Sequence, residues 1–298
     1  MADAIATEDV PLHAGGYDFA VRVYPATEPD GTVLVWMHGG AFIFGDLDMP
    51  EADDVARNLA ARGTTVVSVD YTLSSLEPIA ILPRPDGMPE PEALMRTDRP
   101  RAAYPVASLQ VVAAFDWARE HAGRYGGDAD LVAIGGASAG GNLAAGAAVR
   151  LRDRGEAKPI GQVLIYPLVH AELPEPDEDL SAALAAMPPA LRFPPEVTRA
   201  LNANYLGDAA ADERCAFPGG HDVRGVAPAL IVSADHDELR PSAEAYAGDL
   251  ARGGVDVSYV REPQIIHGFL NMPHEPAATR THDRIAAFLA ACSKGIDA

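Results

Sequence analysis

Ser138 lies at the centre of a glycine-rich segment, residues 136–140 (Gly-Ala-Ser-Ala-Gly), whose small residues could present a nucleophile. The pattern Gly-x-Ser-x-Gly also occurs in glycine-serine loops and in phosphate-binding turns, so the pattern alone is weak. Here an apolar run at 131–134 precedes it and an alanine-rich helix is predicted over 139–154. A sharp turn between strand and helix strains the serine backbone and exposes its hydroxyl, and glycine at both flanks lets the helix pack closely. The context therefore favours a nucleophilic serine.

A second glycine-rich turn, His38-Gly39-Gly40, directly follows an apolar run at 32–37. Such a turn can present two backbone N–H groups to one point, which suits the negative oxygen that develops during acyl transfer. We therefore expect Gly39 and Gly40 to line an oxyanion hole. The third donor would be the N–H of Ala139, at the positive end of the following helix. The alternative is an ordinary tight turn, and His38 is assigned a role in fixing the loop.

An acid and a histidine follow late in the chain, each after a predicted strand. The run at 229–233 leads into an Asp-His-Asp segment at 235–237, and the run at 255–260 leads towards His267. His267 could take the proton from the serine while a carboxylate holds its ring in the required tautomer. The segment at 235–237 could also suggest a metal site, but adjacent residues on a turn rarely converge on one ion. We therefore expect no metal.

The elements around these residues alternate between strand-like and helix-like segments. This alternation is typical of a mostly parallel sheet flanked by helices on both faces. We predict strands at 17–24, 32–37, 64–69, 131–134, 162–166, 229–233 and 255–260. We predict helices at 52–62, 106–124, 139–154, 242–252 and 281–292. The expected fold class is α/β, with a central sheet of about seven or eight strands.

Two segments interrupt this alternation within a single predicted domain covering residues 1–298. The proline-rich segment 74–103 cannot form one long regular element, and 171–225 combines acidic stretches and proline pairs with a predicted helix at 196–206. Both follow apolar strands, and insertions there lie over the crevice where open α/β sheets bind ligands. We expect 171–225 to be a cap segment and 74–103 to be a lid or pocket loop rather than a solvated loop.

The segment 74–103 also carries a basic cluster, formed by Arg84, Arg96, Arg99 and Arg101. An arginine in the pocket could pair with a carboxylate of the substrate. Charge balance with neighbouring surface acids is the simpler interpretation, and we favour it.

Composition excludes several classes of partner. The chain has 298 residues, 48% of them hydrophobic, and a formal net charge of −20, so nucleic acid and anionic membranes would repel it. No apolar run is long enough to cross a bilayer. The N-terminal residues lack the basic and apolar regions of a secretion signal, so we expect a cytoplasmic protein. The two cysteines, Cys215 and Cys292, are expected to be reduced thiols.

Four motifs in order resemble those of the bacterial hormone-sensitive-lipase-like esterases of the α/β-hydrolase superfamily. They are His38-Gly39-Gly40-Ala41-Phe42, Gly136-Ala137-Ser138-Ala139-Gly140-Gly141-Asn142, Asp237-Glu238-Leu239-Arg240 and His267-Gly268-Phe269. The similarity runs from about the first strand to the last helix and implies the α/β-hydrolase fold. In the family the acid begins an Asp-x-Leu-x-Asp element, which implies Asp237 rather than Asp235.

The resemblance also implies an activity. A small-molecule carboxylic ester, of small or short acyl chain, would be cleaved through an acyl-enzyme by Ser138, His267 and Asp237. Gly39, Gly40 and Ala139 would form the oxyanion hole. No metal or organic cofactor would be required, and relatives are monomers or homodimers. A specialised lactone, amide or aryl-ester hydrolase is the alternative, and a non-catalytic ligand-binding homologue is a weaker one because no triad residue is missing.

The sequence departs from the family pattern around the expected site. Ala137 replaces the acidic residue usual before the nucleophile, and Pro241 replaces the second aspartate of the acid motif. The first strand is predicted near Tyr17, which leaves no room for the N-terminal helical half of the family's cap. Our hypothesis is that the long segment 74–103 replaces that half-cap, which leaves the cap reduced.

Overall fold

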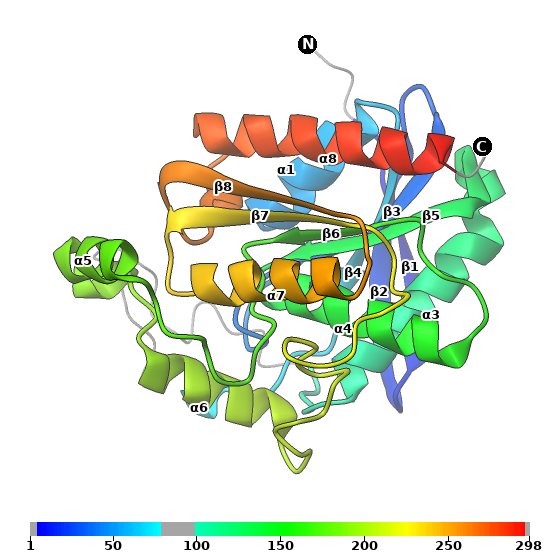
Figure 1. The fold of residues 1–298 in the computed structure, drawn as a ribbon. Coiled ribbons are helices and arrows are strands. Elements are labelled where there is room, and N and C mark those ends of the chain that lie inside the picture. The colour runs from blue at the N-terminus through cyan, green and yellow to red at the C-terminus, as the bar shows by residue number, and fades with distance from the viewer. Residues whose placement is uncertain (1–4, 79–98, 296–298) are drawn as a thin grey trace.

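A computed structural model describes residues 5–78 and 99–295, which form a central eight-stranded sheet covered by helices (Figure 1). The sheet order is β1-β2-β4-β3-β5-β6-β7-β8. The strands are β1 (Glu8–Ala14), β2 (Tyr17–Tyr24), β3 (Gly31–Met37), β4 (Thr65–Asp70), β5 (Gly127–Ala137), β6 (Gln162–Ile165), β7 (Ala229–His236) and β8 (Val257–Ile266). β1 and β2 pair antiparallel with their neighbours, and every pair from β4 to β8 is parallel. The predicted α/β-hydrolase fold with a mostly parallel sheet is confirmed.

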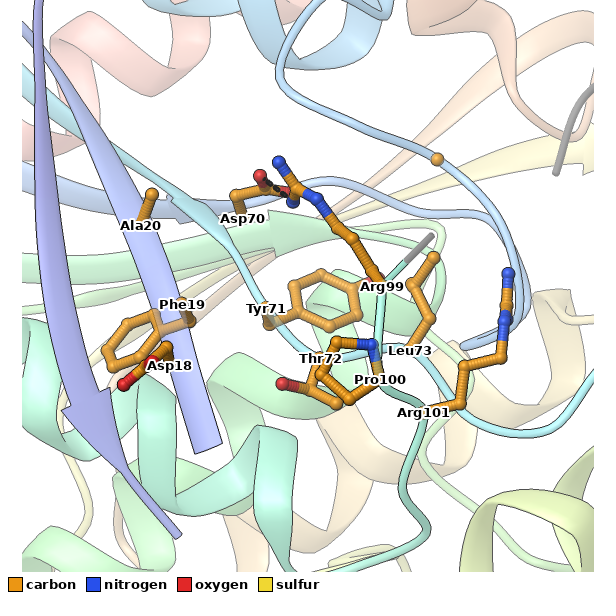
Figure 2. A pocket seen from close by; sticks show the side chains of 11 residues that line it. Asp18, Phe19, Ala20, Asp70, Tyr71, Thr72, Leu73, Arg99, Pro100 and Arg101 are labelled. Carbon is orange, nitrogen blue, oxygen red and sulfur yellow. Dashed lines mark hydrogen bonds and ion pairs between the residues drawn. The ribbon is translucent and has the colours of Figure 1, made fainter. Parts of the chain in front are cut away.

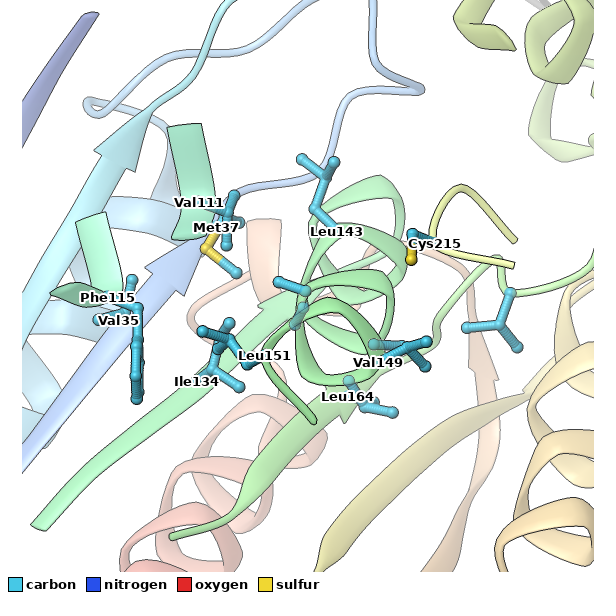
Figure 3. Close-up of a cluster of buried hydrophobic side chains, with 14 of the residues drawn as sticks. Val35, Met37, Val111, Phe115, Ile134, Leu143, Val149, Leu151, Leu164 and Cys215 are labelled. Carbon is cyan, nitrogen blue, oxygen red and sulfur yellow. The ribbon is translucent and has the colours of Figure 1, made fainter. Parts of the chain in front are cut away.

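Helices cover both faces of the sheet. The α-helices of the described residues are α1 (Pro50–Ala60), α3 (Val106–His121), α4 (Ala139–Arg154), α5 (Glu178–Ala186), α6 (Pro195–Leu206), α7 (Arg240–Arg252) and α8 (Pro276–Lys294). α1 and α8 lie on one face, and α3, α4 and α7 lie on the other (Figure 1). Each face buries its own hydrophobic cluster, and Figure 3 shows the one around α4, where Val35, Ile134 and Leu164 of the strands meet Leu143 and Leu151 of the helix.

The strands at the centre of the sheet are mostly apolar because both faces are covered. β3 is buried at every position after its first, and β4 is buried throughout. Because these strands are parallel, the carboxyl ends of β3, β5, β7 and β8 lie along one edge, where the chemically interesting residues follow.

Helix α4 begins and ends at the residues predicted from the sequence. It starts directly after the strained Ser138 and ends at Gly155, whose φ of +76° is the left-handed conformation that glycine adopts freely. The Gly155 N–H donates to the carbonyl oxygens of Leu151 and Arg152, which satisfies the last turn of the helix.

The structure corrects the prediction that the first strand begins near Tyr17. β1 precedes it and pairs with β2 through a two-residue turn, Gly15-Gly16, in which both glycines have positive φ. Pro11 obscured this strand in the sequence, because proline cannot donate a ladder hydrogen bond. β1 lies at the edge of the sheet and pairs on one side only, where proline is tolerated.

The segment 171–225 contains one helix more than predicted. α6 matches the expected helix at 196–206, whereas α5 was predicted as acidic loop. The Asp177 side chain accepts a 2.7 Å hydrogen bond from the N–H of Leu180 and so caps α5, while Leu180 and Leu184 bury its inner face. Residues 79–98 of the predicted lid lie outside the described residues, so that hypothesis stays a prediction.

Candidate active site

Ser138 occupies a sharp turn between β5 and α4. Its φ of +55° and ψ of −117° lie in a region that non-glycine residues rarely adopt, and such strain is concentrated at functional sites. The turn is held from both sides, because the Ser138 N–H donates to the carbonyl of Ile165 at 2.9 Å and its own carbonyl accepts from Asn142 at 3.0 Å. The side chain is thereby fixed at the carboxyl edge of the sheet.

Gly140 shows why small residues flank this turn. A Cβ at this position would lie 2.2 Å from the carbonyl oxygen of Met37 and 2.5 Å from that of His38. Both contacts are with backbone atoms, which cannot rotate away. The close packing of α4 against the end of β3 therefore requires glycine here.

This packing predicts a large stability effect. Gly140→Ala should lower the free energy of unfolding by about 3 kcal/mol or more, because overpacking against backbone has no local remedy. Gly123→Ala is the matched control: Gly123 is exposed, a Cβ added to it would meet no atom within 4 Å, and the substitution should change stability by less than about 0.5 kcal/mol. Urea unfolding of both variants measures the difference. Equal stability of the two would contradict the packing argument.

His267, Ser138 and Asp237 form one continuous chain of hydrogen bonds. The His267 Nε2 lies 2.9 Å from the Ser138 Oγ, and its Nδ1 lies 2.8 Å from the Asp237 Oδ2. With the proton on Nδ1, the ring donates to Asp237 and accepts the serine hydroxyl proton. Asp237 is fully buried, and its other oxygen accepts from the N–H of Leu239 at 2.9 Å. The three side chains predicted from the sequence thus lie together.

Asp235, the alternative acid, has different partners. Its carboxylate forms ion pairs with Arg240 at 3.2 Å and with Arg261 at 3.3 Å, and it accepts from the N–H of Gln264. The geometry therefore distinguishes the two aspartates, and Asp237 is the one in contact with His267.

The electrostatic surroundings of His267 are strongly negative. Burial alone would lower its pKa, but the charge and hydrogen bond of Asp237, together with the charges of Glu51 and Glu238, raise the pKa above its ordinary value. The ring is also enclosed by the aromatic edges of Tyr166, at 4.8 Å between centroids, and Phe193, at 5.3 Å.

The His38-Gly39-Gly40 turn is held by several side chains. His38 is buried, stacks on Tyr71 with 4.5 Å between ring centroids, and donates from Nδ1 to the carbonyl of Gly39 at 2.7 Å. The Tyr71 hydroxyl donates to the same carbonyl at 3.3 Å and to that of His38 at 3.0 Å. These contacts agree with a loop-fixing role for His38.

The three backbone amides expected to bind the oxyanion, those of Gly39, Gly40 and Ala139, differ in their surroundings. The Gly39 N–H donates at 2.6 Å to the Oε1 of Glu51, so this amide is already engaged. Gly40 and its neighbour Ala41 line the cavity beside Ser138, with φ values of +106° and +54°. Ala139 is the first residue of α4, where N–H groups have no partner inside the helix.

A cavity of about 550 Å³ opens over Ser138 and His267. Its walls come from the turn after β3, from the carboxyl edge of the sheet and from the segment 171–225, and most of its side chains are apolar. The lining side chains include Phe44, Met49, Leu168, Phe193, Thr198, Leu201 and Leu239, with Asp46, Glu51 and Asn271 as further polar groups. The segment 171–225 therefore contributes directly to the space in which a ligand would bind, as expected if it forms a cap.

Two ion pairs join the segment 171–225 to the loop that carries Asp237. Arg192 pairs with the buried Glu238 at 2.9 Å, and Asp177 at the start of α5 pairs with the buried Arg240 at 2.9 Å. The two contacts flank the acid loop at neighbouring positions of the chain. The segment 171–225 thus contacts the loop that carries Asp237 at two positions.

The arginines of the basic cluster do not border this cavity where they are described. Arg99 and Arg101 border another cavity, of about 260 Å³. Figure 2 shows Arg99 paired with Asp70 there. Arg101 donates to the carbonyl oxygens of Ile43 and Ser74. Arg84 and Arg96 lie outside the described residues.

Two residues of the site, Glu51 and Tyr166, were not predicted as site residues from the sequence. Glu51 resembles an ordinary acidic residue in the first turn of a helix, and Tyr166 lies at a strand end outside the four motifs. The hydrogen bond between them joins positions 115 residues apart in the chain.

Within residues 5–78 and 99–295, no group of three or more His, Cys, Asp or Glu side chains could hold a metal ion. No helix in these same ranges has the length and hydropathy needed to span a membrane.

Comparison with known proteins places this geometry in a family. A family model described as alpha/beta hydrolase fold matches residues 34–81 and 98–271. The chain is 33% identical over 264 residues to the carboxylesterase NlhH of Mycobacterium tuberculosis, covering 85% of this chain and 72% of that protein. It is 27% identical to an arylesterase of Saccharolobus solfataricus, covering 97% and 83%. A hyperthermophilic esterase of Pyrobaculum calidifontis superposes with a TM-score of 0.79 at 30% identity, covering 97% and 84%.

Fold and family match together define an α/β hydrolase. Within that class the chain belongs to the hormone-sensitive-lipase-like family, as its motifs predicted. It is an ester-cleaving serine hydrolase.

Proposed function

We propose that Ser138, His267 and Asp237 are the catalytic triad and that they cleave small or short-acyl carboxylic esters through an acyl-enzyme. The observation that carries this proposal is the pair of hydrogen bonds, 2.9 Å and 2.8 Å long, that links the three side chains. Ser138 Oγ attacks the ester carbonyl as its proton passes to His267 Nε2. His267 then protonates the leaving alcohol and activates the water that releases the acid, while Asp237 orients the ring.

The oxyanion would be bound by backbone amides next to Ser138. We propose Gly40 and Ala139 as donors, as expected from the sequence, and Ala41 in place of Gly39. The bond from the Gly39 N–H to Glu51 supports this revision, because an amide engaged at 2.6 Å is not available to the substrate. Gly40 and Ala41 both line the cavity.

The cavity supports a preference for neutral esters. Its described lining is largely apolar and includes the acidic side chains of Asp46 and Glu51, but neither lysine nor arginine. A substrate carrying its own carboxylate would be repelled there, and a small apolar acyl chain would be accommodated. The related Saccharolobus enzyme is named an arylesterase, so aryl esters belong among the candidate substrates.

A substrate panel tests the proposed function. Hydrolysis of p-nitrophenyl acetate, butyrate and octanoate should be compared with that of γ-butyrolactone and δ-valerolactone at matched enzyme concentration. We expect kcat/KM to be highest for acetate or butyrate and lower for octanoate. Faster turnover of a lactone would support the alternative of a specialised hydrolase.

A cytoplasmic location and a monomeric or homodimeric state stay predictions, as does the lack of nucleic-acid and membrane partners.

The surroundings of His267 predict the pH dependence of this activity. The neutral imidazole is the base, and its pKa is raised above the ordinary value of about 6.5 because the carboxylates of Asp237, Glu51 and Glu238 outweigh burial. As the pH falls through the raised pKa the ring gains a proton, so kcat/KM should be lost at a midpoint above about 6.5. Profiles of kcat/KM between pH 5 and pH 9 measure this midpoint. A midpoint clearly below that value would contradict the assignment.

A further inference from the structure

Glu51 is a buried acid that the triad mechanism does not use. It lies in the first turn of α1, where acidic residues are common because they complement the helix dipole, but such residues usually face solvent. Glu51 is only 2% exposed. Its backbone is also fixed, since its N–H donates to Asn271 Oδ1 at 3.3 Å and its carbonyl accepts from the Trp36 indole at 2.8 Å.

The Glu51 side chain holds one side of the His38-Gly39-Gly40 turn, here called the oxyanion loop. Its Oε1 accepts the N–H of Gly39, while the carbonyl of Gly39 is held by His38 and Tyr71. In a planar trans peptide the C=O and the following N–H point in opposite directions. Fixing the Gly39 carbonyl towards His38 and Tyr71 therefore directs the N–H of Gly40 to the opposite side.

The other carboxylate oxygen of Glu51 reaches the environment of the base. Its Oε2 accepts the hydroxyl of Tyr166 at 2.9 Å, and the edge of the Tyr166 ring packs against the His267 imidazole. Burial, reinforced by the charge of Glu51, holds the pKa of Tyr166 well above its usual range, so the hydroxyl stays a donor. The Glu51 carboxylate thus links the oxyanion loop to Tyr166, the side chain that packs against His267.

We propose that Glu51 is a positioning residue: by holding the N–H of Gly39 it fixes the His38–Gly39 peptide, and with it the turn that presents the Gly40 amide to the oxyanion, and through Tyr166 it fixes the ring of His267. The inference rests on the proposed function, because it assigns Glu51 a part in that same reaction. Its negative charge also borders the cavity and stabilises the imidazolium that forms during the reaction, from a different element than Asp237 and Glu238.

Glu51→Gln is the principal test, with Asp54→Asn as its control. Both remove one carboxylate from α1, but Asp54 is not among the residues that line the cavity. We expect Glu51→Gln to lower kcat about 10- to 100-fold, with KM changed less than about 3-fold, because it loosens the turn that presents the Gly40 amide to the oxyanion in the transition state. The carboxylates of Asp237, Glu51 and Glu238 together raise the pKa of His267. Glu51→Gln removes one of these three charges, so the pKa of His267 should fall and the acid limb of the pH profile should move to lower pH. Asp54→Asn should change none of these.

Two further variants separate positioning from charge and remain informative if Glu51→Gln does not fold. Glu51→Asp keeps the charge but shortens the side chain, so kcat should fall while the acid limb stays in place. Tyr166→Phe keeps the ring and removes the hydroxyl, and should also lower kcat. Wild-type kcat in every folded variant of Glu51 and Tyr166 would overturn the inference. If the unmodified chain hydrolyses no ester of the panel, the proposed function itself fails, independently of Glu51.

Discussion

Ser138→Ala is expected to lower kcat for p-nitrophenyl butyrate by about four to six orders of magnitude, because it removes the oxygen atom that we propose forms the acyl-enzyme. The remaining rate would come from the oxyanion hole and from substrate binding, which the substitution leaves in place. Alanine meets the same backbone strain at φ +55° as serine does, so the fold should persist. The loss should therefore appear in kcat, with little change in thermal unfolding.

Ser258→Ala is the control for this experiment. Ser258 is exposed on β8, the strand that leads to His267, and its substitution removes the same hydroxyl group from a surface position. Its kcat should equal that of the unmodified protein. If Ser138→Ala retained more than about a tenth of the activity, Ser138 could not be the nucleophile.

Asp237→Asn should have the second-largest effect, a loss of about 10⁴-fold in kcat. An asparagine amide would donate to His267 Nδ1 and so favour the tautomer with its proton on Nε2, which cannot accept the proton of Ser138. The 2.8 Å contact between Asp237 and His267 is the basis of this prediction. Because the side chains are nearly isosteric, the loss should occur without unfolding, as circular dichroism can verify.

Asp235→Asn provides the comparison that distinguishes the two acids. Asp235 pairs with Arg240 and Arg261 rather than with His267, and Arg240 keeps its contacts with Asp177 and Glu244 when Asp235 is neutralised. Its kcat should stay within about 10-fold of the unmodified protein, the range expected when no reacting group is displaced. A larger loss for Asp235→Asn than for Asp237→Asn would reverse the assignment.

The sequence predicted those parts of the fold that depend on local signals. Helix α4 was predicted with its observed limits because a glycine-flanked turn starts it and Gly155 ends it. β1 was missed because Pro11 argues against a strand unless the strand is known to be an edge, and edge position follows only from the order of the assembled sheet. α5 was missed because Asp177 and the acids after it also suit a solvated loop.

The site residues, too, could be predicted only where they depend on local sequence signals. Ser138, Asp237 and His267 could be named because each follows a recognisable strand within a motif. The engagement of the Gly39 amide could not be predicted, because it depends on Glu51 from another element and on Tyr166 from a third. Such contacts between distant segments of the chain carry no local pattern. The glycine-rich turn therefore indicated where the amides gather, but not which of them faces the cavity.

Covalent labelling by a p-nitrophenyl alkylphosphonate tests the central claim most directly, because phosphonylation requires an activated serine beside an oxyanion hole. Intact-mass measurement should show one phosphonyl group per chain, and peptide mapping should place it on Ser138. Ser138→Ala should acquire none under the same conditions. Absence of labelling in the unmodified protein, or a label on another residue with Ser138 unmodified, would contradict the proposed triad.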